Sequence, residues 1–150
     1  MKTTANDLVQ SVKRWADSPA TASDRMPRIL VVDDEEPLLR YVNRVLSGAG
    51  YLVTLASGGP AAIEAAARDR FDLLVTDVSM PEMSGAQLVL RLRQDDPDLK
   101  VLYLTGCTDL LFEERATLRQ EEAFLEKPCS AIELLQAVEL AITGRVTRAI

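Results

Sequence analysis

The chain has 150 residues, the length of one ordinary domain, and 47% of them are hydrophobic, which is enough to build a buried core. Its 17 basic and 23 acidic residues give a formal net charge of −6, and this acidic balance argues against direct binding to nucleic acid. The sequence contains no histidine, which excludes histidine triads, histidine metal sites and imidazole general bases. Any chemistry must therefore depend on carboxylates, hydroxyls, lysine or thiols.

Nothing in the sequence indicates export or insertion into a membrane. No apolar run approaches the roughly 18 residues that a membrane-spanning helix needs, and the first ten residues lack the apolar stretch of a signal peptide. The two cysteines, Cys107 and Cys129, are expected to be free thiols in a reducing compartment. We therefore expect a cytoplasmic protein without membrane contact.

The first 27 residues differ in pattern from the rest of the chain. Leu8, Val9, Val12 and Trp15 have the spacing of one face of a short amphipathic helix, and a stretch rich in Ser, Thr, Ala and Pro covers 18–24. We interpret residues 1–27 as a leader and linker, either partly disordered or containing a helix that docks on this domain or on a partner.

From residue 28 onwards, apolar strands alternate with amphipathic helices. The predicted strands cover 29–32, 51–55, 71–76, 100–104 and 123–126. The predicted helices cover about 38–49, 61–68, 86–94, 109–119 and 130–142, and residues 144–150 form a tail. Five βα units in succession predict an α/β fold with a doubly wound parallel sheet and helices on both faces. Strand orders 2-1-3-4-5 and 3-2-1-4-5 both fit, and five strands favour the first, flavodoxin-like order.

Polar side chains follow four of these strands at their carboxyl ends. Asp33 and Asp34 follow the first strand, Asp77 the third, Thr105 the fourth and Lys127 the fifth. In the order 2-1-3-4-5 these four strands are neighbours, so the side chains should converge on one pocket. Carboxylates that crowd together repel one another and need a cation, and oxygen ligands without His or Cys select Mg²⁺ first and Mn²⁺ second.

The remaining polar groups indicate the chemistry of the pocket. Lys127 supplies a positive charge suited to a phosphoryl oxygen, and Thr105 can donate its hydroxyl to another. Asp33 and Asp34 have the position of cation ligands, whereas Asp77 stands alone on the central strand opposite Lys127. We therefore predict a phosphoryl-binding site in which Asp77 is the nucleophile.

The same stretches resemble a known family. Ile29 to Asp34, Leu73 to Gly85, Leu102 to Gly106 and Phe124 to Pro128 resemble the motifs of response-regulator receiver domains of bacterial two-component signalling. The resemblance covers residues 28–143. It includes all five residues expected to take part in the chemistry, which are Asp33, Asp34, Asp77, Thr105 and Lys127. It implies a domain that accepts a phosphoryl group from a phosphohistidine on a sensor histidine kinase or a histidine phosphotransfer protein.

The resemblance also implies a role for each site residue. Asp77 accepts the phosphoryl group; Asp34, Asp77 and the backbone carbonyl of Ser79 bind Mg²⁺ directly, and Asp33 binds it mainly through water. Lys127 pairs with the acyl phosphate. Ser79 and Cys107 match two variable positions that tune how fast the acyl phosphate hydrolyses.

A switch is implied as well. Thr105 moves toward the phosphoryl group, and Phe124 matches the aromatic position that responds to this motion, unless Phe124 is simply part of the core. The motion couples the pocket to the face formed by the helix at 109–119, the fifth strand and the helix at 130–142. Because no output domain fits after residue 143, we expect signalling through an unidentified protein partner.

Other functions compete with this interpretation. A phosphohydrolase with an aspartate nucleophile usually places that residue after the first strand with a second carboxylate two residues later, whereas Val78 and Ser79 follow Asp77 here. The sequence therefore favours a phosphoacceptor over a turnover enzyme. It leaves open a phosphate sink or shuttle and a docking module that works without phosphorylation.

Overall fold

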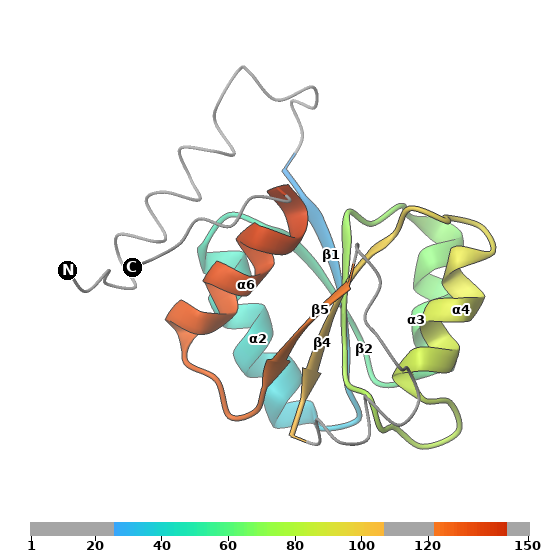
Figure 1. Ribbon diagram of the computed structural model, residues 1–150, viewed down its shortest axis with the longest axis horizontal. Helices are drawn as coiled ribbons and strands as arrows, with labels where there is room; N and C mark the ends of the chain where they lie inside the picture. The colour runs from blue at the N-terminus through green and yellow to red at the C-terminus, as the bar shows by residue number, and fades with distance from the viewer. Residues whose placement is uncertain (1–25, 107–121, 144–150) are drawn as a thin grey trace.

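A computed structural model of the chain describes residues 26–106 and 122–143, in which strands and helices alternate (Figure 1). The strands are β1 (Arg28–Val32), β2 (Leu52–Ala56), β3 (Leu73–Thr76), β4 (Lys100–Thr105) and β5 (Glu122–Glu126). The helices are α2 (Glu36–Gly48), α3 (Gly59–Arg68), α4 (Gly85–Arg93) and α6 (Ala131–Thr143). Within the described residues no helix is both long enough and apolar enough to span a membrane.

The five strands form one parallel sheet in the order β2-β1-β3-β4-β5. β1 pairs directly with β3, with Ile29 opposite Leu73 and Val32 opposite Thr76, which excludes the order 3-2-1-4-5. The predicted fold class and the favoured strand order are therefore confirmed.

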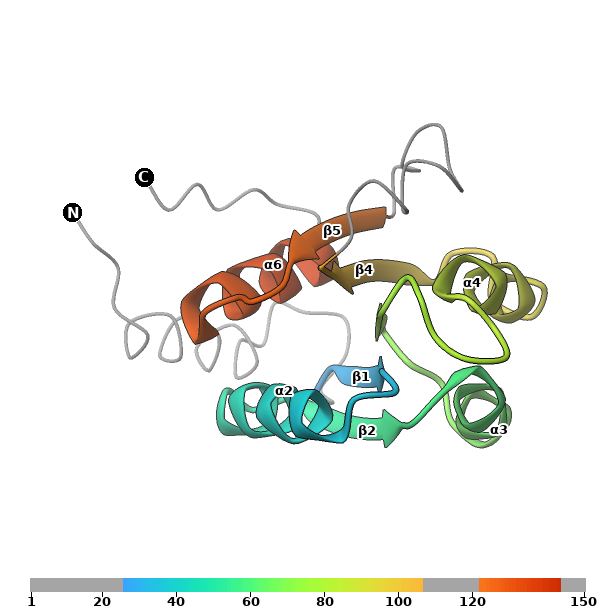
Figure 2. The ribbon, with the colours of Figure 1, turned by 90° about the horizontal axis from the view of Figure 1, so that it is seen from below.

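Helices cover both faces of the sheet, with α2 and α6 on one side and α3 and α4 on the other (Figures 1 and 2). Ile29, Val31, Leu73 and Val75 point into the core beneath α2 and α6. Their neighbours in the sequence point into a second core beneath α3 and α4. Strands that are buried on both faces explain why β1 and β3 are continuous apolar runs rather than alternating ones.

The boundaries differ from the predicted ones by one or two residues in most elements. α3 begins at Gly59 rather than 61, because Pro60 is compatible with the first turn of a helix, where its missing N–H costs no hydrogen bond. β3 begins at Leu73 rather than 71, although Asp72 already bonds through its backbone N–H to the carbonyl of Arg28.

Some predicted features lie outside the described residues. These are the leader at 1–25, with its amphipathic segment, the helix at 109–119 and the tail at 144–150. Residues 26 and 27 of the predicted leader are described and lead directly into β1.

The sheet has two distinct ends. All five strands end on the side where Asp33, Asp77 and Lys127 follow them. α6 runs back in the opposite direction, and near its end the carbonyl of Ile142 accepts a hydrogen bond from Nζ of Lys100, the first residue of β4. The start of β1 and the end of α6 therefore lie at the end of the sheet remote from these side chains (Figure 1).

Tyr51 carries a buried hydroxyl that has no hydrogen-bond partner among the described residues. Burial raises the pKa of Tyr51 well above its ordinary value, and the charge of Glu139 adds to the shift. The folded state thus favours the neutral phenol. The protein therefore loses stability as pH rises above the unfolded pKa near 10, because the phenol then ionises in the unfolded state and stays neutral in the folded state.

We expect Tyr51→Phe to raise the free energy of unfolding by about 1 kcal/mol at pH 7, because it removes an unsatisfied buried group. At pH 10.5 the advantage should grow by a further ~0.8 kcal/mol, since the unfolded phenol ionises there. Urea unfolding of both proteins at the two pH values measures the difference. An advantage that does not change with pH would show that Tyr51 ionises equally well in the folded state.

Candidate functional site

Three carboxylates meet at the carboxyl end of the sheet. Asp33 and Asp34 follow β1, and Asp77 follows the adjacent strand β3. Each offers one oxygen, and these three oxygens lie within 4.8 Å of one another. The convergence predicted from the strand order is therefore present in the structure.

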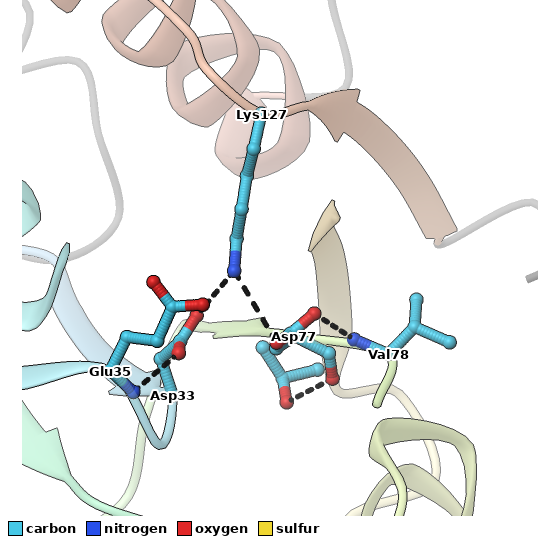
Figure 3. A network of polar contacts seen from close by, with 6 residues as sticks. Asp33, Glu35, Asp77, Val78 and Lys127 are labelled. Atoms are coloured by element: carbon cyan, nitrogen blue, oxygen red, sulfur yellow. Dashed lines mark hydrogen bonds and ion pairs between the residues drawn. The ribbon is translucent and has the colours of Figure 1, made fainter. Parts of the chain in front are cut away.

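Lys127 reaches this cluster from the end of β5 (Figure 3). Its Nζ lies 2.8 Å from Oδ2 of Asp33 and 3.3 Å from Oδ2 of Asp77. Burial alone would lower the pKa of Lys127, but its bonds to Asp33 and its attraction to Asp77 outweigh this, and the pKa is raised. Lys127 is thus a firmly protonated ammonium shared by two carboxylates.

Asp33 and Asp34 have different surroundings although they are adjacent in sequence. Asp33 is buried, and both of its oxygens are occupied, Oδ1 by the backbone N–H of Glu35 at 2.8 Å and Oδ2 by Lys127. Asp34 is exposed, and its carboxylate makes no hydrogen bond or ion pair with another described residue. The oxygens of Asp34 are therefore the more available for a cation.

Asp77 is buried, although less deeply than Asp33. Its Oδ1 accepts a hydrogen bond from the backbone N–H of Val78 at 2.8 Å, and its carbonyl oxygen accepts one from the hydroxyl of Thr76 at 3.0 Å. Burial raises the pKa of Asp77, and the charge of Asp33 raises it further, while Lys127 opposes both effects. The pKa of Asp77 is therefore raised overall even with the ammonium of Lys127 beside it.

A glycine allows the chain to pass close to Asp77. Gly85 begins α4, and its backbone N–H bonds to the carbonyl of Val78 at 2.8 Å. A Cβ at this position would lie 2.1 Å from the carbonyl oxygen of Asp77. The sequence motif contains Gly85 without indicating its role, and the signal that could have identified it is a glycine directly after the helix cap Ser84.

The other predicted site residues are placed less fully. The backbone of Thr105 ends β4 opposite Glu126, and Cys107 lies outside the described residues. Ser79 is exposed in the loop that follows Asp77. Phe124 is 38% exposed on β5 and belongs to neither core cluster, so it is not a buried core residue in this structure. Cys129 is a half-buried free thiol whose pKa is raised mainly by burial.

The donor set fits a hard divalent cation. It consists of three carboxylate oxygens at the mouth of a loop, one of them on the exposed Asp34, with neither histidine nor thiolate among them. Oxygen-only sets of this kind suit Mg²⁺ or Mn²⁺ rather than zinc or copper. A partly open site also leaves room for water and for a phosphoryl oxygen.

The chain is similar to proteins of known family. Residues 29–139 match the response regulator receiver domain family. The response regulator receiver protein CpdR of Brucella abortus is 34% identical over 114 residues, which cover 76% of this chain and 95% of CpdR. The response regulator MprA of Mycobacterium leprae is 41% identical over 112 residues, which cover 74% of this chain and 49% of MprA. The chain thus spans nearly all of one relative and about half of the other.

Solved structures agree with this assignment. The signal receiver domain of an HD domain-containing protein from Pseudomonas fluorescens Pf-5 matches with a TM-score of 0.73 and 31% identity, over 80% of this chain and 97% of that one. The chemotaxis protein CheY4 of Vibrio cholerae matches with a TM-score of 0.69 and 28% identity, over 78% of this chain and 99% of that one. The acidic cluster is typical of the magnesium site of receiver domains. The chain therefore belongs to the response regulator receiver domain family of two-component phosphorelays, whose members are phosphorylated by histidine kinases and are not turnover enzymes.

Proposed function

We propose that this chain accepts a phosphoryl group on Asp77 from a phosphohistidine of a sensor histidine kinase or a phosphotransfer protein. The observation that carries the proposal is the position of Asp77, whose Oδ2 lies 3.3 Å from the ammonium of Lys127 within the cluster of three carboxylates. This arrangement provides both a nucleophile and the positive charge that a transferred phosphoryl group requires.

In the transfer step, a carboxylate oxygen of Asp77 attacks the phosphorus of the phosphohistidine. A P–O bond forms as the P–N bond breaks, and the imidazole leaves with the electron pair of that bond. Lys127 is already within reach of Asp77 and pairs with the new phosphoryl oxygens. Mg²⁺ held by Asp34, Asp77 and the carbonyl of Ser79 would neutralise further phosphoryl charge.

The remaining residues have supporting roles in the proposal. Asp33 holds Lys127 and approaches the cation through water, which is consistent with both of its oxygens being occupied. Ser79 and Cys107 tune the lifetime of the acyl phosphate. Thr105 follows the phosphoryl group, and Phe124 responds by changing position and so signals to a protein target. The partial exposure of Phe124 supports this switch over a phosphate sink or a phosphorylation-independent docking module.

Labelling with a small phosphodonor tests the proposal. With Mg²⁺ and acetyl phosphate, the protein should take up about one equivalent of phosphoryl group, because Asp77 contacts Lys127 within the cluster and is less buried than Asp33, whose two oxygens are both occupied. Intact-mass spectrometry measures the uptake, and Asp77→Asn should abolish it. Undiminished labelling of the Asp77→Asn protein at another side chain would refute the assignment.

The two neighbouring aspartates should differ in their effect on Mg²⁺ affinity. We expect Asp34→Ala to weaken Mg²⁺ binding about tenfold and Asp33→Ala to weaken it less, because only Asp34 is proposed as a direct ligand. Titration of backbone amide resonances with MgCl₂ measures both dissociation constants. Equal losses in the two variants would contradict the division into direct and water-mediated roles.

A further inference from the structure

The loop between Asp77 and α4, residues 78–84, begins at the site, where the backbone N–H of Val78 donates to Oδ1 of Asp77. Ser79, Pro81 and Glu82 in this loop are exposed. The side chain of Val78 is part of the core beneath α3 and α4, and those of Met80 and Met83 pack against that core. Beyond Val78, the loop therefore contacts this core through the two methionines.

Met83 packs directly onto a glycine at the start of α3. A Cβ added to the buried Gly59 would lie 2.7 Å from Sδ, 3.0 Å from Cγ and 2.9 Å from Cβ of Met83. Rotation of the methionine side chain can move Sδ and Cγ away, but it cannot move Cβ. Any side chain at position 59 must therefore displace the backbone, either of the loop at Met83 or of α3 at its first residue.

The adjacent glycine provides a contrast within the same turn. Gly58 has an extended backbone, with φ at 177°, and the nearest atom to an added Cβ is Cδ of Pro60 at 4.0 Å. Of the two glycines before Pro60, only Gly59 has a close approach to the loop. The contact between Gly59 and Met83 is thus specific to one position.

We propose that Gly59 and Met83 are positioning residues that fix residues 78–84 over Asp77 and thereby set the Mg²⁺ affinity and phosphoryl uptake of the site. This inference rests on the proposed function, in which the carbonyl of Ser79, four residues before Met83, is a cation ligand. The hydrogen bond from Gly85 N–H to the Val78 carbonyl ties the two ends of the loop together, and Ser84, next to Met83, caps α4. The contact between Met83 and Gly59 holds the loop against the start of α3.

Substitution of Gly59 tests the inference. In Gly59→Ala the Mg²⁺ dissociation constant should rise about tenfold, the size of effect seen when groups that orient metal ligands are lost. In metal-free protein, the amide resonances of Val78 to Met83 should shift more than those of α2. Gly58→Ala should leave both the dissociation constant and these resonances close to those of the unsubstituted protein.

Two further variants separate positioning from general loss of stability. Ala62→Gly replaces a buried alanine of α3 by a residue of lower helix propensity, so it should lower the unfolding midpoint. It should leave the Mg²⁺ dissociation constant unchanged. Met83→Ala removes two of the three close atoms, so Gly59→Ala should raise the dissociation constant only about threefold in that background. Met83→Ala by itself should also weaken Mg²⁺ binding, which keeps the test decisive if Gly59→Ala does not fold.

The outcomes distinguish this inference from the proposed function. The positioning role would be overturned if Gly59→Ala and Met83→Ala bound Mg²⁺ as tightly as Gly58→Ala and the loop resonances did not shift. Labelling of Asp77 in the unsubstituted protein would still support the proposed function in that case. Absence of labelling in the unsubstituted protein would refute the proposed function, and the resonances of Val78 to Met83 in metal-free protein would still decide whether the contact positions the loop.

Discussion

Arg93→Ala should lower the free energy of unfolding by about 3–5 kcal/mol, the range for breaking a buried ion pair by removing one partner. Nη1 of Arg93 lies 2.6 Å from Oε2 of Glu122, and the two side chains are 6% and 0% exposed. Nε and Nη2 of Arg93 also donate to the carbonyl of Leu99. Truncation would leave the Glu122 carboxylate buried without this cation and would remove both donors to Leu99.

A neighbouring arginine on the same helix provides the control. Arg91 forms an ion pair with Asp95 at 3.6 Å, but the two side chains are 47% and 85% exposed, and Arg91→Ala should cost less than about 0.5 kcal/mol. Urea unfolding of the two variants gives the comparison. Replacing both Arg93 and Glu122 by methionine should recover most of the loss, because no charge is then left buried. Similar stability losses in Arg91→Ala and Arg93→Ala would show that burial does not strengthen the Arg93 pair.

Gly85→Ala should be the most damaging glycine substitution in the described part of the chain. The added Cβ would lie 2.1 Å from the carbonyl oxygen, 3.1 Å from the carbonyl carbon of Asp77 and 3.3 Å from Cα of Val78. All three atoms belong to the backbone, so no side-chain rotation can relieve the overlap. We expect a loss of about 3 kcal/mol in unfolding free energy, at the upper end for overpacking, together with slower labelling of Asp77.

Gly48→Ala is the matched control. Gly48 ends α2, and an added Cβ there would meet nothing within 4 Å. Alanine favours the helix, so this substitution should raise the unfolding free energy by up to about 1 kcal/mol. Thermal unfolding and acetyl phosphate labelling of both variants check the contrast. Normal stability and labelling in Gly85→Ala would mean that the backbone at Asp77 can move away without cost.

The parallel sheet could be predicted from the sequence because it follows from the alternation of strands and helices. The number of strands favours the order 2-1-3-4-5 over 3-2-1-4-5, and the convergence of the carboxylates with Lys127 depends on that order. Once strands and helices alternate, the ends of parallel strands must share one edge. Asp33 and Asp77 follow the neighbouring strands β1 and β3, and Lys127 follows β5, which β4 separates from β3. The packing of individual side chains could not be predicted in this way. It depends on distances between residues far apart in the sequence.

Arg93 and Glu122 illustrate what the sequence did not reveal. They are 29 residues apart, and Glu122 precedes the predicted start of the fifth strand, so nothing local indicates that they pair. The contact of Met83 with Gly59 is hidden for the same reason. The different surroundings of Asp33 and Asp34 depend on which of two adjacent side chains turns toward Lys127. The resemblance implied different roles for the two aspartates toward the cation, but neither it nor the spacing of residues indicated the contact of Asp33 with Lys127.

The position of the two ends of the described chain has a practical consequence. Met26 leads into β1, and α6 ends beside the start of β4, so both ends leave the domain at the side of the sheet opposite Asp77. Groups attached to residues 26 or 143 would therefore extend away from Asp77. A fluorescent label, an affinity handle or a fused protein at either point leaves the approach to Asp77 open, so assays on immobilised protein can report on the same site as assays in free solution.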